Sequence, residues 1–417
     1  MGNGKTHGMD AGVPPKPKDA GTGLAGGVAS ADKNLGNKAE GSQKQPCQIK
    51  VLRAEIVEVT FQSHIKVYHR TDDFIVRAPH WREAQDVKEG AYSKRPAVYL
   101  VKSNAKTRDV TVMVRVKESK NITGDGKLMG YLRGRKGELR IEGRCPLSVG
   151  EHKVLAQIKE LPDGIEWYYG DMTWGLEAAS LGKSISLNNT RVEVFIVLDV
   201  PRDEIYQNKK GVWIEALRLI CEKTGVIGVK ESRKAAEKIS RYCHGSHGLK
   251  YDAMIGMSHF DADEKGGKFA LYAYLKKFLT TVNCYDQAAA LQALGGALGI
   301  KLRWLFLKPY GFIKVTNLVG WGKCNNPFFR NPAYNKNKVV ARNNPKRSLF
   351  GNHAFCGLDV YVLDACAGPH GGEEMRGSYI ASSIDNKTTL YSKLPIPHNR
   401  PGNFGDLKTP FGLNEVE

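Results

Sequence analysis

The fold is decided by the stretch Val282-Asn-Cys-Tyr-Asp-Gln-Ala-Ala-Ala-Leu-Gln-Ala-Leu-Gly-Gly-Ala-Leu-Gly-Ile300. Beyond Cys284 most of its residues are strong helix formers, and Asn283 is a favourable N-cap residue. Apolar side chains recur at the three- and four-residue intervals of one helix face, at Ala288, Leu291, Leu294 and Leu298. The stretch therefore predicts a buried, Ala-rich helix whose first turn contains Cys284.

The position of Cys284 favours a reactive thiol. The first turn of a helix offers unpaired backbone N–H groups and the positive end of the helix dipole, and both stabilise a thiolate. Gly295, Gly296 and Gly299 are expected to loosen and then end the helix, and residues 301–307 to form a strand. Because a buried cysteine is also common as a small core residue, the thiol needs a nearby base to count as a nucleophile.

The best candidate base lies downstream, within residues 352–366, which predict a tight hairpin. A two-residue turn at 357–358 places His353 diagonally across from Asp364, and one at 358–359 places them directly opposite. A three-residue turn would put them on opposite faces. With either two-residue turn, His353 can take the thiol proton while Asp364 fixes its orientation.

In these elements the chain resembles the transglutaminase-like superfamily of papain-like thiol enzymes. The residues that carry the resemblance are Cys284, Ala288, Leu291, Leu294, Gly299, Ile300, His353 and Val362-Leu363-Asp364. By this resemblance Cys284 is the nucleophile, His353 the general base and acid, and Asp364 the group that orients the histidine. The match spans roughly residues 205 to 370, and Phe355 stands where the family usually has Trp, two residues after the histidine.

The resemblance implies a thiol acyl-transfer enzyme that acts on amide bonds and needs no cofactor and no metal. Its second substrate decides between a peptidase, deamidase or amidase, which use water, and a cross-linking transglutaminase, which uses an amine; we favour hydrolysis. A bacterial effector or toxin is one setting for such an enzyme. The alternative is a catalytically inactive transglutaminase-like domain that serves as a binding or scaffold protein. The histidines in 243–247 and 259–261 offer metal ligands, but polar loop residues are the preferred interpretation.

The sequence predicts an α+β fold in three parts. Residues 1–46 contain ten Gly, four Pro and no Phe, Trp or Tyr, which is typical of a disordered leader. Residues 47–200 predict an antiparallel, immunoglobulin-like β-sandwich, and residues 201–417 the transglutaminase-like catalytic domain, entered through a linker at 201–207. The strands expected in the sandwich are 49–61, 97–101, 110–116, 128–132, 139–143, 153–158, 166–169 and 192–198. Helices are expected at 211–221, 230–242 and 269–279.

The net charge of +19 is unevenly distributed. Residues 301–350 contain 11 Lys and Arg and no Asp or Glu, and they join the Cys helix to the His strand. One interpretation is a cleft that attracts an acidic protein or peptide-containing substrate, with Trp321, Lys323 and Arg330 as substrate-binding residues. The other is an ordinary solvated surface. Nucleic acid is a disfavoured partner, because no zinc finger, RNP-like run or basic heptad pattern is found.

The chain has the features of a protein made in the cytoplasm. No apolar run approaches the roughly 20 residues that span a bilayer, so no membrane span is expected. The first residues lack the apolar stretch of a signal peptide, which leaves signal-independent secretion as the route for any export. The eight cysteines show no Cys-x-x-Cys pairing, which disfavours a zinc framework or a dense set of disulfides.

Overall fold

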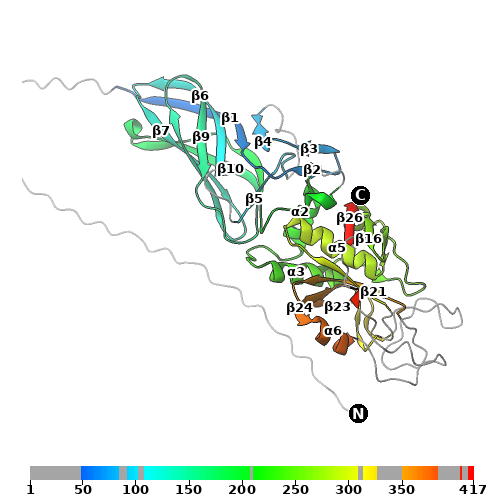
Figure 1. Ribbon diagram of the computed structural model, residues 1–417. Coiled ribbons are helices and arrows are strands. Elements are labelled where there is room, and N and C mark those ends of the chain that lie inside the picture. The colour runs from blue at the N-terminus through cyan, green and yellow to red at the C-terminus, as the bar shows by residue number, and fades with distance from the viewer. Residues whose placement is uncertain are drawn as a thin grey trace, which may run out of the picture. The chain divides into compact units, whose positions relative to one another are not determined.

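The structure is a computed structural model. It describes residues 48–83, 92–101, 108–206, 210–308, 313–325, 350–383, 404–405 and 412–417. The expected leader at 1–46 lies outside the described residues, and residues 48–417 form one compact unit. Helices and strands both occur, and strands dominate, as the predicted α+β class requires (Figure 1). Among the described helices, none is both long and apolar enough to cross a bilayer.

The first part of this unit is one sheet of ten strands. Its hydrogen-bonded order is β4-β1-β6-β9-β8-β7-β10-β12-β5, and β11 pairs with β10. Neighbouring strands are antiparallel except for β5 and β12, which are parallel. The strands are β1 (Val51–Phe61), β4 (His80–Arg82), β5 (Ala97–Leu100), β6 (Asp109–Lys120), β7 (Asp125–Arg133), β8 (Glu138–Pro146), β9 (Gly150–Ile158), β10 (Glu166–Ala178), β11 (Lys183–Ser186) and β12 (Thr190–Val197).

Alternating apolar residues build this sheet. In β6 the valines at 110, 112, 114 and 116 are all buried, while the residues between them are only partly covered. A period of two places every second side chain on the same face, and these faces share one hydrophobic core. Each of the eight strands expected here is present.

The hydrogen bonds connect the strands of the expected sandwich along one path. Strand β10 changes partners along its length, pairing with β12 through Glu166–Met172 and with β7 through Thr173–Glu177. A strand shared in this way joins the two halves into one sheet. Register shifts in β1, between Arg53 and Ala54 and again between Ile56 and Glu58, add the local bends typical of β-bulges.

The second part contains helices α2 to α6 together with several short sheets. The helices are α2 (Ile214–Lys223), α3 (Ser232–Arg241), α4 (Leu271–Lys276), α5 (Cys284–Ala297) and α6 (Arg376–Ser383). A five-stranded sheet has the order β24-β22-β21-β18-β25, formed by β24 (His370–Met375), β22 (Tyr361–Asp364), β21 (His353–Leu358), β18 (Arg303–Leu307) and β25 (Phe404–Gly405). The smaller sheets are β13-β2-β3, β14-β17, β15-β16-β26 and β20-β19-β23. Their strands are β2 (Val67–His69), β3 (Phe74–Val76), β13 (Val212–Trp213), β14 (Lys250–Tyr251), β15 (Ala262–Asp263), β16 (Gly266–Phe269), β17 (Thr281–Val282), β19 (Thr316–Leu318), β20 (Gly322–Cys324), β23 (Ala367–Gly368) and β26 (Gly412–Val416).

Helix α5 lies at the centre of this second part, against β21, α3 and α2 (Figure 1). Every residue of α5 except Tyr285 is buried. Leu291 and Leu294 are fully buried, and each such side chain contributes about 1.5–3 kcal/mol of transfer free energy. A helix that is covered all round belongs in a core, as the sequence predicts.

The glycines of α5 differ from expectation. Gly295 and Gly296 lie inside the helix, which continues to Ala297. A Cβ at Gly295 would lie 3.0 Å from a methyl group of Leu302, and one at Gly296 would lie 3.1 Å from Ile205. These two glycines therefore allow close packing and do not end the helix. Only Gly299, with a φ of 81°, acts as the predicted stop.

The expected linker packs along the same helix. Arg202 donates its backbone N–H to the carbonyl of Gly296 at 2.9 Å, and the Tyr206 hydroxyl donates to the carbonyl of Ala293 at 2.8 Å. Tyr206 is fully buried. The Gly296 carbonyl also accepts the backbone N–H of Gly299 at 3.0 Å, so these bonds add to those within the helix end.

Gly299 provides a test of this packing. An added Cβ would lie 2.3 Å from the carbonyl oxygen of Asp199, so Gly299→Ala must move backbone as well as adopt a strained φ. We expect a loss of more than about 3 kcal/mol in the free energy of unfolding, measured by urea denaturation. Gly182→Ala is the matched control, because its φ is 66° and nothing lies within 4 Å of the added Cβ. It should lose only about 1–2 kcal/mol; equal losses would contradict the packing described here.

Candidate active site

Cys284 is the first residue of α5, and a capping box fixes the helix start. The Asn283 side chain accepts the backbone N–H groups of Tyr285 at 2.9 Å and Asp286 at 3.1 Å. In return the Asp286 carboxylate accepts the backbone N–H of Asn283 at 3.0 Å. The thiol of Cys284 therefore stands in the first turn, at the positive end of the helix dipole, with the residue 4% exposed.

His353 and Asp364 lie on the predicted hairpin, but its turn falls one residue beyond the later of the two expected positions. Leu358 pairs with Tyr361, so the two-residue turn is Asp359–Val360, and Asp359 has a φ of 55°. This register keeps His353 and Asp364 on one face, diagonally related. Gly357 stays in the strand, where a Cβ would lie 2.8 Å from Leu305.

The Asp364 carboxylate is fully hydrogen-bonded and buried. One oxygen accepts from His353 Nε2 at 2.7 Å and from the Tyr379 hydroxyl at 2.8 Å. The other accepts the backbone N–H groups of Cys366 at 2.8 Å and Ala367 at 3.1 Å. Burial alone would raise the pKa of Asp364, but the charge and hydrogen bond of His353 outweigh it and hold that pKa well below its usual value.

His353 is fully buried and has the opposite shift. Burial alone lowers the pKa of an imidazole, but the charge and hydrogen bond of Asp364, joined by a hydrogen bond with the Cys284 side chain, raise the pKa of His353 to about 10. The structure thus brings the three residues predicted for catalysis together. Because Nε2 bonds Asp364, Nδ1 is the ring nitrogen that would exchange a proton with the thiol.

Aromatic side chains pack around the imidazole. Phe355 stacks on the His353 ring with centroids 5.6 Å apart, and the centroid of Phe350 lies 5.2 Å from that of His353. Tyr379 packs on Phe355 at 4.8 Å while its hydroxyl reaches Asp364. These rings hold the histidine in a dry environment, where its bond to a carboxylate is strong.

Tyr379 was missed at the sequence level. It lies on α6, which is not among the helices predicted from the sequence. Helix α6 has only eight residues, too few to show a clear amphipathic pattern in the sequence. The partner of Tyr379, Asp364, is 15 residues away along the chain. A buried tyrosine needs a partner for its hydroxyl, but the sequence does not show which one.

Further side chains connect the Cys helix to the elements around it. Tyr285 donates its hydroxyl to Asn352 at 2.6 Å, which links the neighbour of the thiol to the neighbour of the imidazole. Gln287 donates to the carbonyl groups of Cys243 at 2.9 Å and Ala365 at 3.2 Å. None of these polar partners was identified from the sequence, because each bond joins segments far apart in the chain.

Of the three residues predicted to bind substrate, the structure describes Trp321 and Lys323. Trp321 is half-buried, and its Nε1 donates to the carbonyl of Tyr251 at 3.0 Å, so the indole supports the site from behind. Lys323 is exposed on β20. Arg330 lies outside the described residues.

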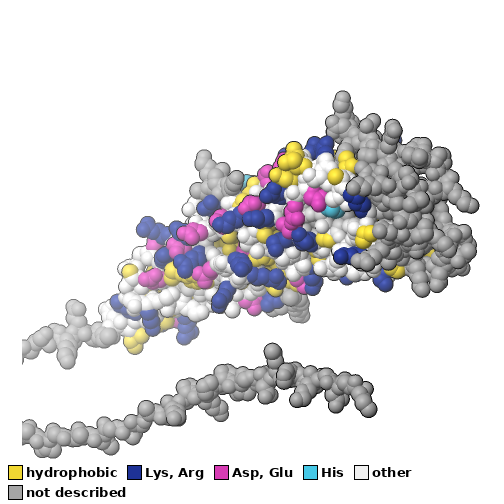
Figure 2. All heavy atoms as spheres, turned by 90° about the horizontal axis from the view of Figure 1, so that it is seen from below, with side chains coloured by type: hydrophobic (Ala, Val, Ile, Leu, Met, Phe, Trp, Pro, Cys, Tyr) yellow, Lys and Arg dark blue, Asp and Glu magenta, His cyan; other side chains and the backbone are white. Residues whose placement is uncertain are grey.

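The acid-free stretch does not gather its described cations at the site. Arg303 and Lys314 donate to the backbone carbonyl groups of Asp359 and Ala381. On the face drawn in Figure 2, Lys and Arg side chains lie among Asp and Glu side chains over the described surface. An acidic substrate therefore remains a prediction from the sequence.

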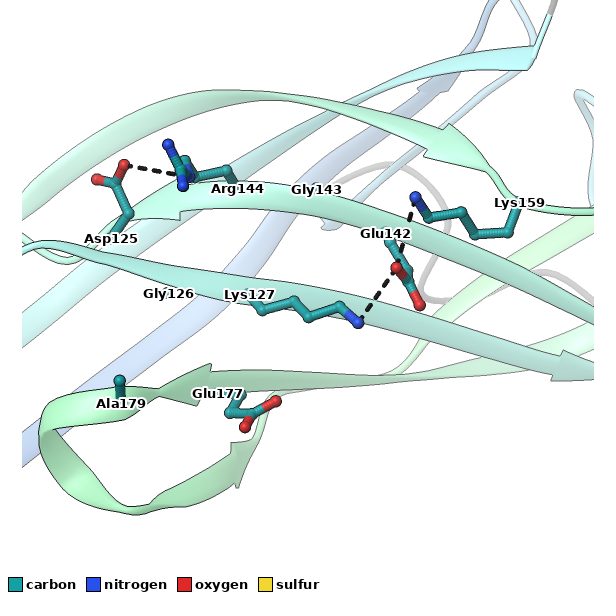
Figure 3. A pocket seen from close by; sticks show the side chains of 9 residues that line it. All are labelled: Asp125, Gly126, Lys127, Glu142, Gly143, Arg144, Lys159, Glu177 and Ala179. Carbon is teal, nitrogen blue, oxygen red and sulfur yellow. Dashed lines mark ion pairs between the residues drawn. The ribbon is translucent and has the colours of Figure 1, made fainter. Parts of the chain in front are cut away.

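Two large cavities of the described residues lie away from the triad. One, of about 710 Å³, crosses β7, β8 and β10 and is lined by ion pairs, among them Lys127–Glu142 at 3.2 Å and Arg144–Asp125 at 3.7 Å (Figure 3). The other, of about 770 Å³, lies beside the Asp359–Val360 turn. The charged side chains that line the first cavity pair with each other, so they do not indicate a catalytic role.

The histidines considered as metal ligands have other partners. His247 lies between the Tyr242 hydroxyl and the Tyr274 carbonyl, both 2.9 Å away, and burial lowers the pKa of His247 to about 4. His244 bonds the carbonyl of Ala365, and His259 lies 3.2 Å from the Asp252 carboxylate. Within the described residues, no three metal-ligating side chains come together.

No protein-family model matches this chain, and no curated protein matches it in sequence. What the site can do is therefore argued from the positions of its own residues. A buried carboxylate, an imidazole and a thiol at a helix start, in this order of contact, are the groups that nucleophilic thiol chemistry requires.

The His353–Asp364 pair predicts how stability depends on pH. The pKa of His353 is about 10 in the folded chain against an ordinary 6.5, so the folded state binds this proton more tightly. Its contribution is complete below pH 6.5 and is lost as the pH rises through about 10, while that of Asp364, whose pKa is lowered, is lost only in acid. We expect the free energy of unfolding to fall between these pH values by up to about 1.4 kcal/mol per pH unit.

Urea denaturation at a series of pH values measures this fall. His353→Gln lacks the titrating group, so its free energy of unfolding should be lower at pH 6 and decline less steeply above it. The same alkaline slope in both proteins would contradict the assigned pair.

Proposed function

We propose that this chain is a thiol acyl-transfer enzyme of the transglutaminase-like kind, acting on amide bonds of a protein or peptide-containing substrate. The observation that carries the proposal is the buried 2.7 Å bond between His353 and Asp364, with Cys284 among the groups that raise the pKa of His353. The proposal is supported by the position of Cys284 at the start of α5, where anions are stabilised.

The proposed reaction begins with a thiolate–imidazolium pair. The proton of Cys284 resides on His353, whose positive charge is balanced by Asp364. The sulfur then attacks the amide carbonyl carbon, and the π electrons move to the oxygen. When the C–N bond breaks, His353 gives its proton to the leaving amine, and an acyl-cysteine remains.

The second half of the reaction decides the kind of enzyme. His353, now neutral, removes a proton from water or from an amine as that nucleophile attacks the acyl-cysteine, and the thiolate leaves. Water gives hydrolysis and an amine gives cross-linking. We favour hydrolysis, since water needs no second binding site.

The burial of the triad favours a second candidate, an inactive domain that binds or scaffolds. His353 is fully buried, and neither of the large cavities described above is lined by Cys284. In that case the triad would be a structural network. Chemical reactivity of Cys284 separates the two candidates.

Limited alkylation with iodoacetamide, followed by peptide mass spectrometry, tests the nucleophile. Cys284 is 4% exposed and the six other described cysteines are at most 1% exposed. Exposure alone predicts a small preference for Cys284, whereas a thiolate–imidazolium pair predicts labelling at least about tenfold faster than at any other described cysteine. His353→Gln should remove that preference, and Cys221→Ala, deep in the core, should leave it unchanged.

The amide-directed activity itself is tested by incubating the protein with a proteome and scoring peptides for cleavage or for loss of ammonia. The Cys284→Ala variant should fold, because the substitution removes little volume. It should show no cleavage or loss of ammonia, because the nucleophile is absent. Turnover by a folded Cys284→Ala variant would dismiss the proposal.

Asp364 and its partner Tyr379 should differ in how strongly they affect the alkylation rate of Cys284. Asp364→Asn changes the group that orients and charges His353, so we expect the alkylation rate of Cys284 to fall by orders of magnitude. Tyr379→Phe removes one hydrogen bond to a charged group, which is worth about 1.5–3 kcal/mol in stability. Its alkylation rate should fall by no more than about tenfold, measured under the same conditions. A larger fall in Tyr379→Phe than in Asp364→Asn would show that Tyr379, and not the charge of Asp364, orients His353.

A further inference from the structure

A tyrosine that the proposed reaction does not use stands beside the nucleophile. Tyr251 ends β14, which pairs in parallel with β17 so that Tyr251 is opposite Val282, two residues before Cys284. The backbone N–H of Asp252 donates to the carbonyl of Val282 at 2.8 Å, which fixes this register next to the start of α5. Partners in a parallel pair lie side by side, so Tyr251 lies next to the strand that leads into Cys284.

The ring of Tyr251 is held on its other side by the residues that flank the imidazole. Its centroid lies 6.0 Å from that of Phe350 in an edge-on contact, and Phe350 lies 5.2 Å from His353. Behind it, Trp321 donates to the carbonyl of Tyr251 at 3.0 Å. Tyr251 thus contacts Phe350, which in turn contacts the imidazole of His353.

The hydroxyl of Tyr251 has the character of a neutral hydrogen-bond donor. The residue is 2% exposed. Burial raises the pKa of Tyr251 well above its usual value, and negative charge on the Cys284 sulfur acts in the same direction. The phenol therefore keeps its proton at neutral pH, close to the sulfur that attacks.

We infer that Tyr251 donates a hydrogen bond to the oxyanion that forms when the Cys284 sulfur adds to a carbonyl carbon. The backbone N–H of Cys284 is the other donor, since the Asn283 side chain takes the N–H groups of Tyr285 and Asp286 instead. In this step the C–S bond forms, the carbonyl π electrons move to oxygen, and the Tyr251 proton stays on the phenol. This inference rests on the proposed function.

Two reactions of the same thiol separate a donor to the oxyanion from a structural tyrosine. Acylation of Cys284 by p-nitrophenyl acetate passes through an oxyanion, whereas alkylation by iodoacetamide displaces iodide at a saturated carbon and forms none. Removing one oxyanion donor typically lowers the rate on the order of 100-fold. For Tyr251→Phe in the full chain we expect that fall in acylation, with alkylation changed by less than about threefold.

Tyr206→Phe is the matched control. Tyr206→Phe removes a buried hydroxyl that donates to the carbonyl of Ala293 in α5. Ala293 is about 13 Å along the helix from Cys284. The substitution should lower the thermal stability and leave both rates unchanged.

Each result decides the question. An equal fall of both rates in Tyr251→Phe assigns the tyrosine to positioning alone, and an unchanged acylation rate denies it any part in the reaction; either outcome overturns the inference while the proposed function stands. The proposed function requires that the parent protein release p-nitrophenolate and that Cys284→Ala abolish this release. If no such Cys284-dependent release is measured, the proposed function and the inference are both wrong.

Discussion

The hydrogen-bonded carboxylate of Asp364 is the interaction on which the arrangement of the site depends. Its four bonds reach β21 through His353, α6 through Tyr379 and the chain after β22 through the N–H groups of Cys366 and Ala367. A buried carboxylate must have its charge and all its lone pairs satisfied, because an unpaired one would cost several kcal/mol. These partners are therefore held in place together, and the imidazole has one available orientation.

A second buried carboxylate fixes the other half of the site. Asp286 accepts from the hydroxyl of Ser258 at 2.6 Å and from the backbone N–H groups of His259 at 2.9 Å and Phe260 at 3.1 Å, besides closing the capping box with Asn283. Burial raises the pKa of Asp286 despite these bonds. The loop before β15 and the start of α5 are thus one polar network, so the thiol is positioned by a rigid helix end.

The continuous ten-stranded sheet and the helical part are joined through backbone contacts at the end of α5. Asp199, just after β12, donates its N–H to the carbonyl of Leu298 at 3.2 Å, and Gly299 packs directly against it. The absence of a Cβ at Gly299 is what allows this approach. The end of the sheet is therefore anchored to the same helix whose first residue is Cys284.

The sequence by itself determined the local features of this protein. Helix propensity, the Asn283 cap and the apolar spacing define α5, period-two alternation defines the strands from β1 to β12, and turn parity places His353 and Asp364 on one face. These signals depend on residues close together in the chain, so they can be recognised in the sequence alone. Tertiary structure alone decided that β10 joins two sheets, that the hairpin turns at Asp359–Val360, that Gly295 and Gly296 serve packing, and that Tyr379, Tyr251 and Asn352 surround the triad. The reason is physical: each of these depends on which surfaces and polar groups, distant in the chain, become buried together and must then satisfy one another.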